Sequence, residues 1–139
     1  MNEVLVDTNV FSFLLRKEDS RASLYRPHIE NRILVLSNVT IGELYFWAET
    51  KNWGDERIRR LEAKIRETTI VRYDLEYCQT YARLKSRLKT PVGSQRLIGE
   101  NDLWLAACAV RHELPLVSHN RRHFEGIAGL KLISEAPQL

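Results

Sequence analysis

The 139-residue sequence lacks the features of several protein classes. Its two cysteines, Cys78 and Cys108, are too few and too far apart for a zinc motif, and they flank no paired-cysteine pattern. No stretch approaches the roughly 18 consecutive apolar residues that a membrane helix needs. Because no basic segment followed by a long apolar run opens the sequence, we expect no signal peptide. The simplest expectation is a cytoplasmic protein with free thiols and no membrane association.

The composition that is present is typical of a globular domain. Hydrophobic residues make up 44% and charged residues 28% of the chain, which excludes the low hydrophobicity and high charge of a disordered protein. A chain near this length buries roughly 68–70% of the surface that its unfolded form exposes, which is enough for a proper core. With no internal repeat, linker or low-complexity tract, the sequence predicts a single domain over residues 1–139.

The formal net charge of +3 is unevenly distributed. Residues 83–123 hold eight basic and three acidic residues, whereas the rest of the chain is slightly acidic. The densest basic stretch contains no acid and comprises Arg83, Lys85, Arg87, Lys89 and Arg96. Composition alone fits a solvated basic helix face as well as a binding site for a polyanion such as nucleic acid.

Short apolar runs of strand length alternate with amphipathic helical patterns. Strands are expected at residues 3–6, 33–36, 69–71, 116–118 and 130–133, with helical spacing between most of them. Runs that are apolar on both faces suit a parallel sheet covered by helices on each side. The sequence therefore predicts one α/β domain.

Acidic residues stand where such a sheet places its ligands, at the carboxyl ends of the strands. Asp7 follows the first strand, Glu43 lies one turn into the helix after the second, and Asp102 opens a helix. Each also has a purely structural explanation. Asp7 can cap the next helix, residues 40–43 match a capping box, and Asp102 can complement a helix dipole.

Taken together, the three carboxylates point to a metal site. Carboxylates collected at one sheet edge repel each other, which raises their pKa values unless a cation neutralises them. Carboxylate oxygens are the ligands that Mg²⁺ and Mn²⁺ prefer, and such a metal can activate water against a phosphodiester. An acidic metal pocket beside a basic segment is the arrangement that a nuclease needs.

Four ordered segments resemble the motifs of PIN-domain ribonucleases, and among these the VapC toxins of bacterial type II toxin–antitoxin pairs are most similar. The segments span residues 4–9, 37–44, 98–107 and 116–124, so that the resemblance covers essentially the whole chain. It implies a three-layer α/β/α domain with a central, mainly parallel sheet. It also implies a homodimer, a cognate VapB-like antitoxin, and a structured RNA substrate, in many members tRNA.

The resemblance also implies residue roles. Asp7, Glu43 and Asp102 match the acidic positions that form the Mg²⁺ or Mn²⁺ pocket, and Thr8 and Ser118 match hydroxyl positions beside it. The fourth motif departs from the pattern, because Asn120 stands where many members carry an acid, which puts a second metal in doubt. The expected phosphate contacts are Arg83, Lys85, Arg87, Lys89, Arg96, Arg121 and Arg122.

Other residues and readings remain open. His119 and His123 flank Asn120, and RNA contact or solvent exposure is favoured over metal ligation because no Cys/His cluster supports them. In the segment 45–47, Tyr45 fits a core face, and its aromatic neighbours form either a core or a partner surface. In an aspartyl-phosphate phosphatase, the nucleophilic aspartate is usually followed two positions later by a second aspartate. Here Asn9 stands two positions after Asp7, which disfavours that activity. A binding module that holds RNA or a partner without cutting is the other alternative.

Overall fold

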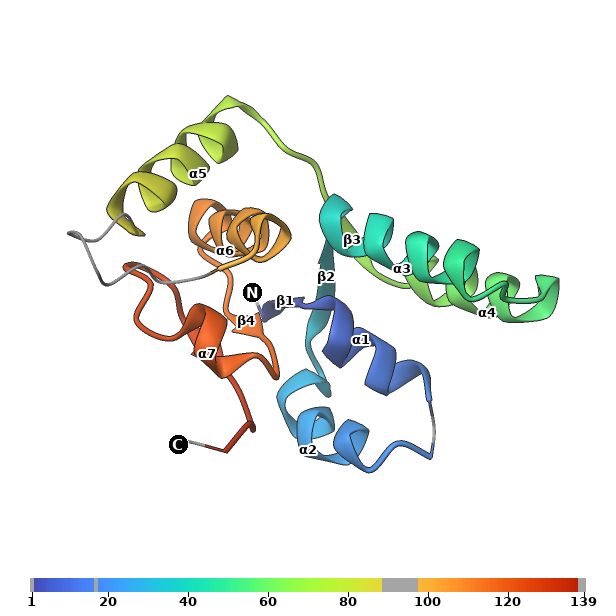
Figure 1. Cartoon of the computed structure of the whole chain (residues 1–139). Coiled ribbons are helices and arrows are strands. Elements are labelled where there is room, and N and C mark those ends of the chain that lie inside the picture. The colour runs from blue at the N-terminus through green and yellow to red at the C-terminus, as the bar shows by residue number, and fades with distance from the viewer. Residues whose placement is uncertain (1, 17, 89–97, 138–139) are drawn as a thin grey trace.

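The expected strands and helices are present along the chain (Figure 1). The computed structural model describes residues 2–16, 18–88 and 98–137. The strands are β1 (Glu3–Val6), β2 (Ile33–Ser37), β3 (Thr69–Val71), β4 (Leu116–Val117) and β5 (Leu132–Ile133). The helices are α1 (Thr8–Leu15), α2 (Ser20–Ile29), α3 (Asn38–Thr50), α4 (Asp55–Arg66), α5 (Leu75–Leu88), α6 (Glu100–His112) and α7 (Arg121–Phe124).

The strands form one parallel sheet in the order β3-β2-β1-β4-β5. After β1 the chain adds β2 and β3 on one side, and it then adds β4 and β5 on the other. The strand order therefore reverses beside β1, at its junction with β4. In open parallel sheets, ligands bind in the crevice at the carboxyl ends of the strands at this switch point. Asp7 follows β1 and so lies at this position.

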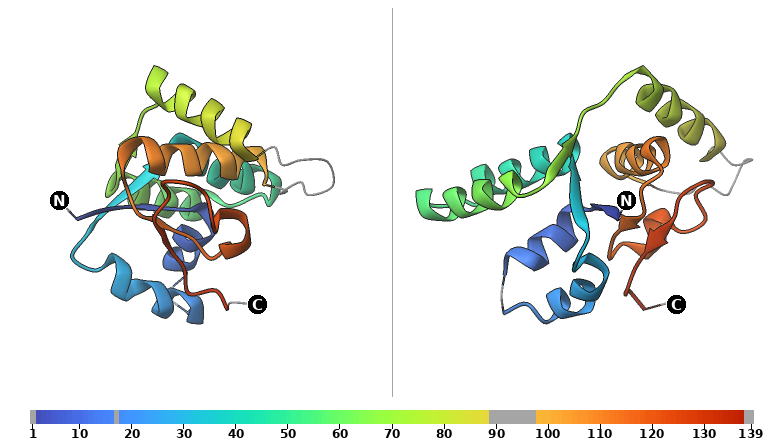
Figure 2. Two further views of the ribbon diagram at one scale, coloured as in Figure 1. Left: turned by 90° about the vertical axis from the view of Figure 1, so that its left-hand side faces the viewer. Right: turned by 180° about the vertical axis from the view of Figure 1, so that it is seen from behind.

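Helices cover both faces of the sheet, which confirms the α/β class and the three layers (Figure 2). Successive strand residues point to opposite faces, so that each strand contributes to two separate cores. One core joins α5 and α6 to Leu5, Val35 and Leu116. The other joins α1, α2, α3 and α4 to Val4, Val6, Leu36 and Val117. Burial on both faces explains why the strands are continuously apolar.

The start of α3 differs from the prediction. The capping box at residues 40–43 is wrong, because the helix already begins at Asn38 with Ser37 as its N-cap. The Ser37 hydroxyl accepts a hydrogen bond from the backbone N–H of Thr40 at 3.2 Å. The chain passes from the last residue of β2 directly into the helix, so that Glu43 lies in the helix interior. Its side chain is therefore available for a role other than capping.

The aromatic segment of α3 is also more exposed than predicted. Tyr45 was expected in the core, but 39% of its surface is exposed, and Phe46 is 63% exposed. The helix packs through Leu44 and Ala48 instead, and the Tyr45 hydroxyl donates to Glu62 of α4 at 2.8 Å. The α3–α4 pair projects from the side of the sheet (Figure 1). The outer surface of this pair therefore presents aromatic side chains to solvent.

The cysteines are free, as expected. Cys108 is buried in the core and Cys78 is partly buried, with no disulfide between them. Burial raises the pKa of the Cys108 thiol to about 12, so that this side chain behaves as an inert apolar group. Within the described part of the chain, no helix combines the length and the apolar character needed to cross a membrane.

Candidate active site

Asp7 is a buried carboxylate at the carboxyl end of the central strand. Only 3% of its surface is exposed. Its Oδ1 accepts the backbone N–H of Val10 at 2.8 Å, which makes it the N-cap of α1, and its Oδ2 accepts the hydroxyl of Ser118 at 2.5 Å. The capping prediction is therefore confirmed. Ser118 directly follows β4, so the neighbouring strands β1 and β4 bring these two side chains together.

Glu43 reaches the same region from α3. The hydroxyl of Thr8 donates to Glu43 Oε1 at 2.6 Å, and it also lies 3.4 Å from the hydroxyl of Thr40. Thr8 directly follows Asp7 and is buried. This bond connects residues 35 positions apart. It therefore fixes the Glu43 carboxylate next to the start of α1. The other carboxylate oxygen of Glu43, Oε2, does not take part in this bond.

Asp102 lies in the first turn of α6 and does not cap it, because Gly99 is the N-cap residue. Its Oδ2 is 2.6 Å from Nδ1 of His123 in α7. About a quarter of the Asp102 side chain remains accessible. His123 thus contacts a proposed metal ligand through a hydrogen bond, while 44% of its side chain stays exposed, in line with the expected solvent exposure.

The three carboxylates lie close enough to affect one another electrostatically. The pKa of Asp7 is raised from 3.8 to about 6: burial and the negative charges of Asp102 and Glu43 raise it, whereas the bonds from Ser118 and Val10 lower it. Burial is the largest of these causes because it removes the water that would solvate the charge. The site therefore holds a carboxylate that has too little positive charge around it.

The donor set fits a hard divalent cation. All three side chains offer carboxylate oxygens, and Asp102 Oδ1 and Glu43 Oε2 are the oxygens that do not accept the bonds described above. In residues 2–16, 18–88 and 98–137, no group of three or more histidine, cysteine or acidic side chains is gathered closely enough to hold a metal ion. Each carboxylate is instead turned to its own partner, which is Ser118, Thr8 or His123.

Asn120 also lies at this edge of the sheet. Its backbone N–H donates to the Ser118 hydroxyl at 3.0 Å, and the same hydroxyl donates to Asp7. It precedes α7 and lines a cavity of about 380 Å³ together with His119 and His123. Its side chain forms no capping bond to α7. The amide is therefore a neutral group at the rim of the site.

The predicted phosphate contacts separate into two groups. On α5, Arg83 contacts the Thr80 hydroxyl, Lys85 pairs with Glu100 at 2.8 Å, and Arg87 is exposed. Because Glu100 opens α6, this pair places the basic end of α5 beside the turn that carries Asp102. Lys89 and Arg96 lie outside the described residues.

Arg121 has a structural role that was not predicted. Its Nε donates to the carbonyl of Ala136 at 3.1 Å, and its Nη2 donates to the carbonyl of Ser134 at 2.9 Å. Arg121 therefore ties the C-terminal segment to α7, which leaves only part of its guanidinium for RNA. Arg122 lies beside it and lines the same cavity.

A comparison with known proteins decides the family. The PIN-domain model matches residues 4–130. The chain belongs to the PIN-domain family. The VapC ribonuclease Y4jK of Sinorhizobium fredii is 32% identical over 138 residues, which span 94% of this chain and 96% of the relative. Ribonuclease VapC2 of Haemophilus influenzae is 29% identical over 131 residues, with the same coverage.

A solved relative supports the same family and fold. The structure of VapBC-1 from nontypeable Haemophilus influenzae is 26% identical, with a TM-score of 0.78. It covers 95% of this chain and 97% of its own. The five-stranded parallel sheet with helices on both faces is therefore a PIN fold, as the sequence motifs predicted.

The sequence pattern did not reveal the partners of the site residues. The bond from His123 to Asp102 spans 21 positions, and a contact between Tyr25 and His119 spans 94. Tyr25 lies in a helix without any recognised motif, so no local signal identified it. The pairing of Thr8 with Glu43 was partly foreseeable, because both match positions of the family motifs.

Proposed function

We propose that this chain is a Mg²⁺- or Mn²⁺-dependent endoribonuclease and the toxin of a toxin–antitoxin pair. The observation that carries the proposal is the buried carboxylate of Asp7 at the switch point of a PIN sheet. Its pKa is raised to about 6 by burial, with further contributions from Asp102 and Glu43. A bound cation would relieve that accumulation of negative charge.

Asp7, Glu43 and Asp102 are the residues that would hold the metal. A bound Mg²⁺ or Mn²⁺ supplies an oriented and acidified water and neutralises charge on a phosphoryl oxygen. The residues around the carboxylates fix their orientation: Ser118 donates to Asp7, Thr8 donates to Glu43, and His123 bonds Asp102. Partners of this kind usually affect metal affinity or activity by about 10- to 100-fold.

The RNA backbone would approach from the basic side of the site. Lys85 and Arg87 lie at the end of α5 that adjoins the start of α6. Arg122 lies in α7, next to His123, which contacts Asp102. Structured RNA, with tRNA first to be tested, is the proposed substrate class. Such RNA is recognised through its shape and its unpaired bases.

A second copy of this chain and a VapB-like antitoxin are the proposed protein partners. Phe46 is 63% exposed on the α3–α4 pair, and Tyr45 beside it is 39% exposed. Contiguous exposed apolar patches mark interaction sites, and aromatic residues are enriched at protein interfaces. The free thiols of Cys78 and Cys108 agree with function in the cytoplasm.

The test is cleavage of purified RNA by the isolated protein. The wild-type chain should cut a tRNA pool with Mg²⁺ or Mn²⁺ and stop in EDTA, and Asp7→Asn should lower the rate by at least about 100-fold, because it removes a direct ligand. Asp19→Asn is the matched control, because Asp19 also caps a helix, α2, with its side chain on Arg21 and away from the three carboxylates. This control should cut normally.

Two outcomes would contradict the proposal. Undiminished cutting by Asp7→Asn would show that the carboxylate site is not the site of cleavage. RNA binding of equal affinity with and without Mg²⁺, without any product, would instead indicate a binding module on the same fold.

A further inference from the structure

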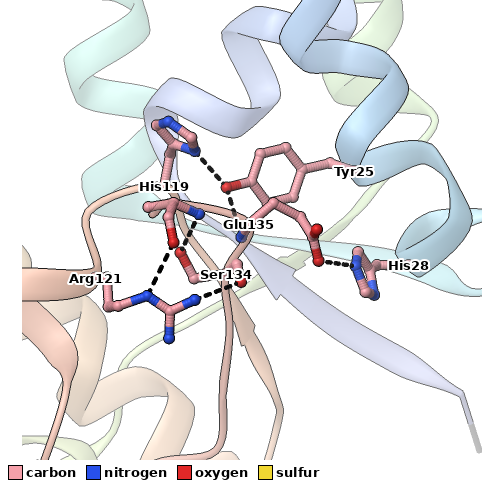
Figure 3. A network of polar contacts seen from close by, with 7 residues as sticks. Tyr25, His28, His119, Arg121, Ser134 and Glu135 are labelled. Carbon is pink, nitrogen blue, oxygen red and sulfur yellow. Dashed lines mark hydrogen bonds and ion pairs between the residues drawn. The ribbon is translucent and has the colours of Figure 1, made fainter. Parts of the chain in front are cut away.

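A partly buried network links the C-terminal segment to the residue beside the carboxylate site (Figure 3). Tyr25 of α2 is completely buried, and its hydroxyl accepts the backbone N–H of Glu135 at 3.0 Å. The same hydroxyl lies 2.5 Å from Nδ1 of His119. His119 directly follows Ser118, which donates to Asp7. The network therefore ends at the residue after Ser118, and Ser118 contacts Asp7, a proposed metal ligand.

The contact with Tyr25 favours one tautomer of His119. Burial raises the pKa of the Tyr25 phenol, so that Tyr25 keeps its proton and can donate it. The Tyr25 hydroxyl accepts from the backbone N–H of Glu135 and can donate its own proton to Nδ1 of His119. With Tyr25 as the donor, Nδ1 is the acceptor and the ring carries its hydrogen on Nε2.

The His119 ring is held in place on two sides. It packs edge-on against Phe13, with ring centroids 5.8 Å apart, and edge-on against Tyr25 at 5.7 Å. Its backbone is fixed by the neighbouring Ser118 and Asn120 contact. Since Nδ1 is occupied by Tyr25, the remaining polar atom of the ring is Nε2. The contact with Tyr25 does not use Nε2.

This residue lines a cavity that adjoins the carboxylate site. The cavity, of about 380 Å³, is lined by residues 119–123 together with Glu125, Ala136 and Pro137. His123, which contacts Asp102, forms part of the same wall. Arg121 and Arg122 contribute two permanent positive charges against the single negative charge of Glu125. The lining of the cavity therefore holds more basic than acidic side chains, which suits a phosphate group.

We propose that this cavity binds a backbone phosphate of the RNA next to the scissile bond, with Nε2–H of His119 as a donor and Tyr25 as the positioning residue for that donor. The inference rests on the proposed ribonuclease function. His119 binds substrate directly, whereas Tyr25 acts through it by fixing its tautomer and ring orientation. The C-terminal segment takes part because Glu135 holds the Tyr25 hydroxyl.

The first experiment measures RNA binding without cleavage. A labelled tRNA is titrated with the full chain in EDTA, and the dissociation constant is read from fluorescence anisotropy. A hydrogen bond to a charged group corresponds to roughly a tenfold change in affinity or more, so His119→Ala should weaken binding by at least about tenfold. His119→Gln should retain most of the affinity, because its amide nitrogen can occupy the place of Nε2.

The role of Tyr25 is tested by a double-mutant cycle. Tyr25→Phe removes only the hydroxyl, and it should weaken RNA binding in the wild-type background but not in the His119→Ala background. His28→Ala is the matched control, because it removes the contact of His28 Nε2 with the Glu135 side chain at 2.9 Å. If loosening of the C-terminal segment were the whole cause, His28→Ala would weaken binding as strongly as Tyr25→Phe.

A spectroscopic measurement tests the tautomer independently of RNA. In ¹⁵N-correlated NMR spectra, His119 of the wild-type chain should show a protonated Nε2 and an acceptor Nδ1, and Tyr25→Phe should lose this preference. A role of Tyr25 in packing alone would leave the tautomer unchanged. If Tyr25→Phe does not fold, the comparison of His119→Ala with His119→Gln still decides whether the donor matters.

The results separate this inference from the proposed function. Normal cleavage by the wild-type chain with unchanged RNA affinity in His119→Ala would overturn the phosphate site alone. Absence of cleavage, with the expected loss of affinity in His119→Ala, would overturn the nuclease and leave the binding site standing. A protonated Nδ1 in the wild-type chain would overturn the role of Tyr25.

Discussion

Replacing Asp7 by asparagine should stabilise the metal-free protein, although the same change should abolish cleavage. Asparagine has nearly the same shape and no charge. Its carbonyl oxygen can accept from the Val10 N–H, and its amide can donate to the Ser118 hydroxyl, which replaces the bond that Ser118 now donates. The substitution therefore removes the buried charge while keeping the hydrogen bonds.

The size of the effect follows from the pKa of Asp7. That pKa is 3.8 for an unperturbed side chain and about 6 in the folded protein. Because the folded-state pKa is raised, the stability associated with protonated Asp7 is complete below pH 3.8 and is lost as the pH rises through about 6. At about 1.4 kcal/mol per pH unit, the ionised side chain costs up to about 3 kcal/mol at pH 8.

The assay compares urea unfolding of wild type and Asp7→Asn in EDTA at pH 8, 5 and 4. The variant should exceed wild type by up to about 3 kcal/mol in unfolding free energy at pH 8, by roughly half of that at pH 5, and by about 0.5 kcal/mol at pH 4. Asp19→Asn is the control with the opposite sign. Hydrogen bonds from Arg21 lower the pKa of Asp19 from 3.8 to about 2. The stability that ionised Asp19 contributes is therefore complete above pH 3.8 and is lost as the pH falls through about 2, so its replacement should destabilise the protein at all three pH values.

One result would refute this reasoning. If Asp7→Asn were less stable than wild type by the same amount at all three pH values, the carboxylate would not be a strained buried charge. Its role would then be that of an ordinary N-cap, whose loss typically costs about 1 kcal/mol.

Two further predictions concern the metal and the partner surface. Mn²⁺ at about 100 times its dissociation constant should raise the unfolding free energy of the wild-type protein by about 2.7 kcal/mol, and it should have little effect on Asp7→Asn. Thermal melting of both proteins measures this difference. Equal shifts in the two proteins would show that the ion binds elsewhere. Phe46→Asp should change the stability of the single chain by less than about 0.5 kcal/mol because Phe46 is 63% exposed. Light scattering should nevertheless show loss of the dimer or of the antitoxin complex, and retention of both would exclude this surface.

The fold was largely predictable because its signals are local. Apolar runs of strand length gave the five strands, and helical spacing gave most helices within a few residues of their observed ends. The errors arose where tertiary packing decides. Tyr45 was assigned to the core from its spacing, but α3 packs through Leu44 and Ala48, and its far end projects beside α4.

The candidate site was predictable as a set of residues but not as a set of contacts. Asp7 and Ser118 could be named because they follow strands, and strand ends meet at one edge of a parallel sheet. Their direct bond, across 111 positions, depends on β4 pairing beside β1. Glu43 could be mistaken for a capping residue until the structure placed the start of α3 at Asn38.

The sequence by itself determined the class of fold, the family motifs and the three acids, because these depend on residue type and short-range spacing. Only the tertiary structure decided which neighbour each acid contacts, that Arg121 ties down the C-terminal segment, and that Tyr25 orients His119. Such contacts join segments that are distant along the chain. They depend on how helices pack around the sheet, and no local pattern encodes that packing.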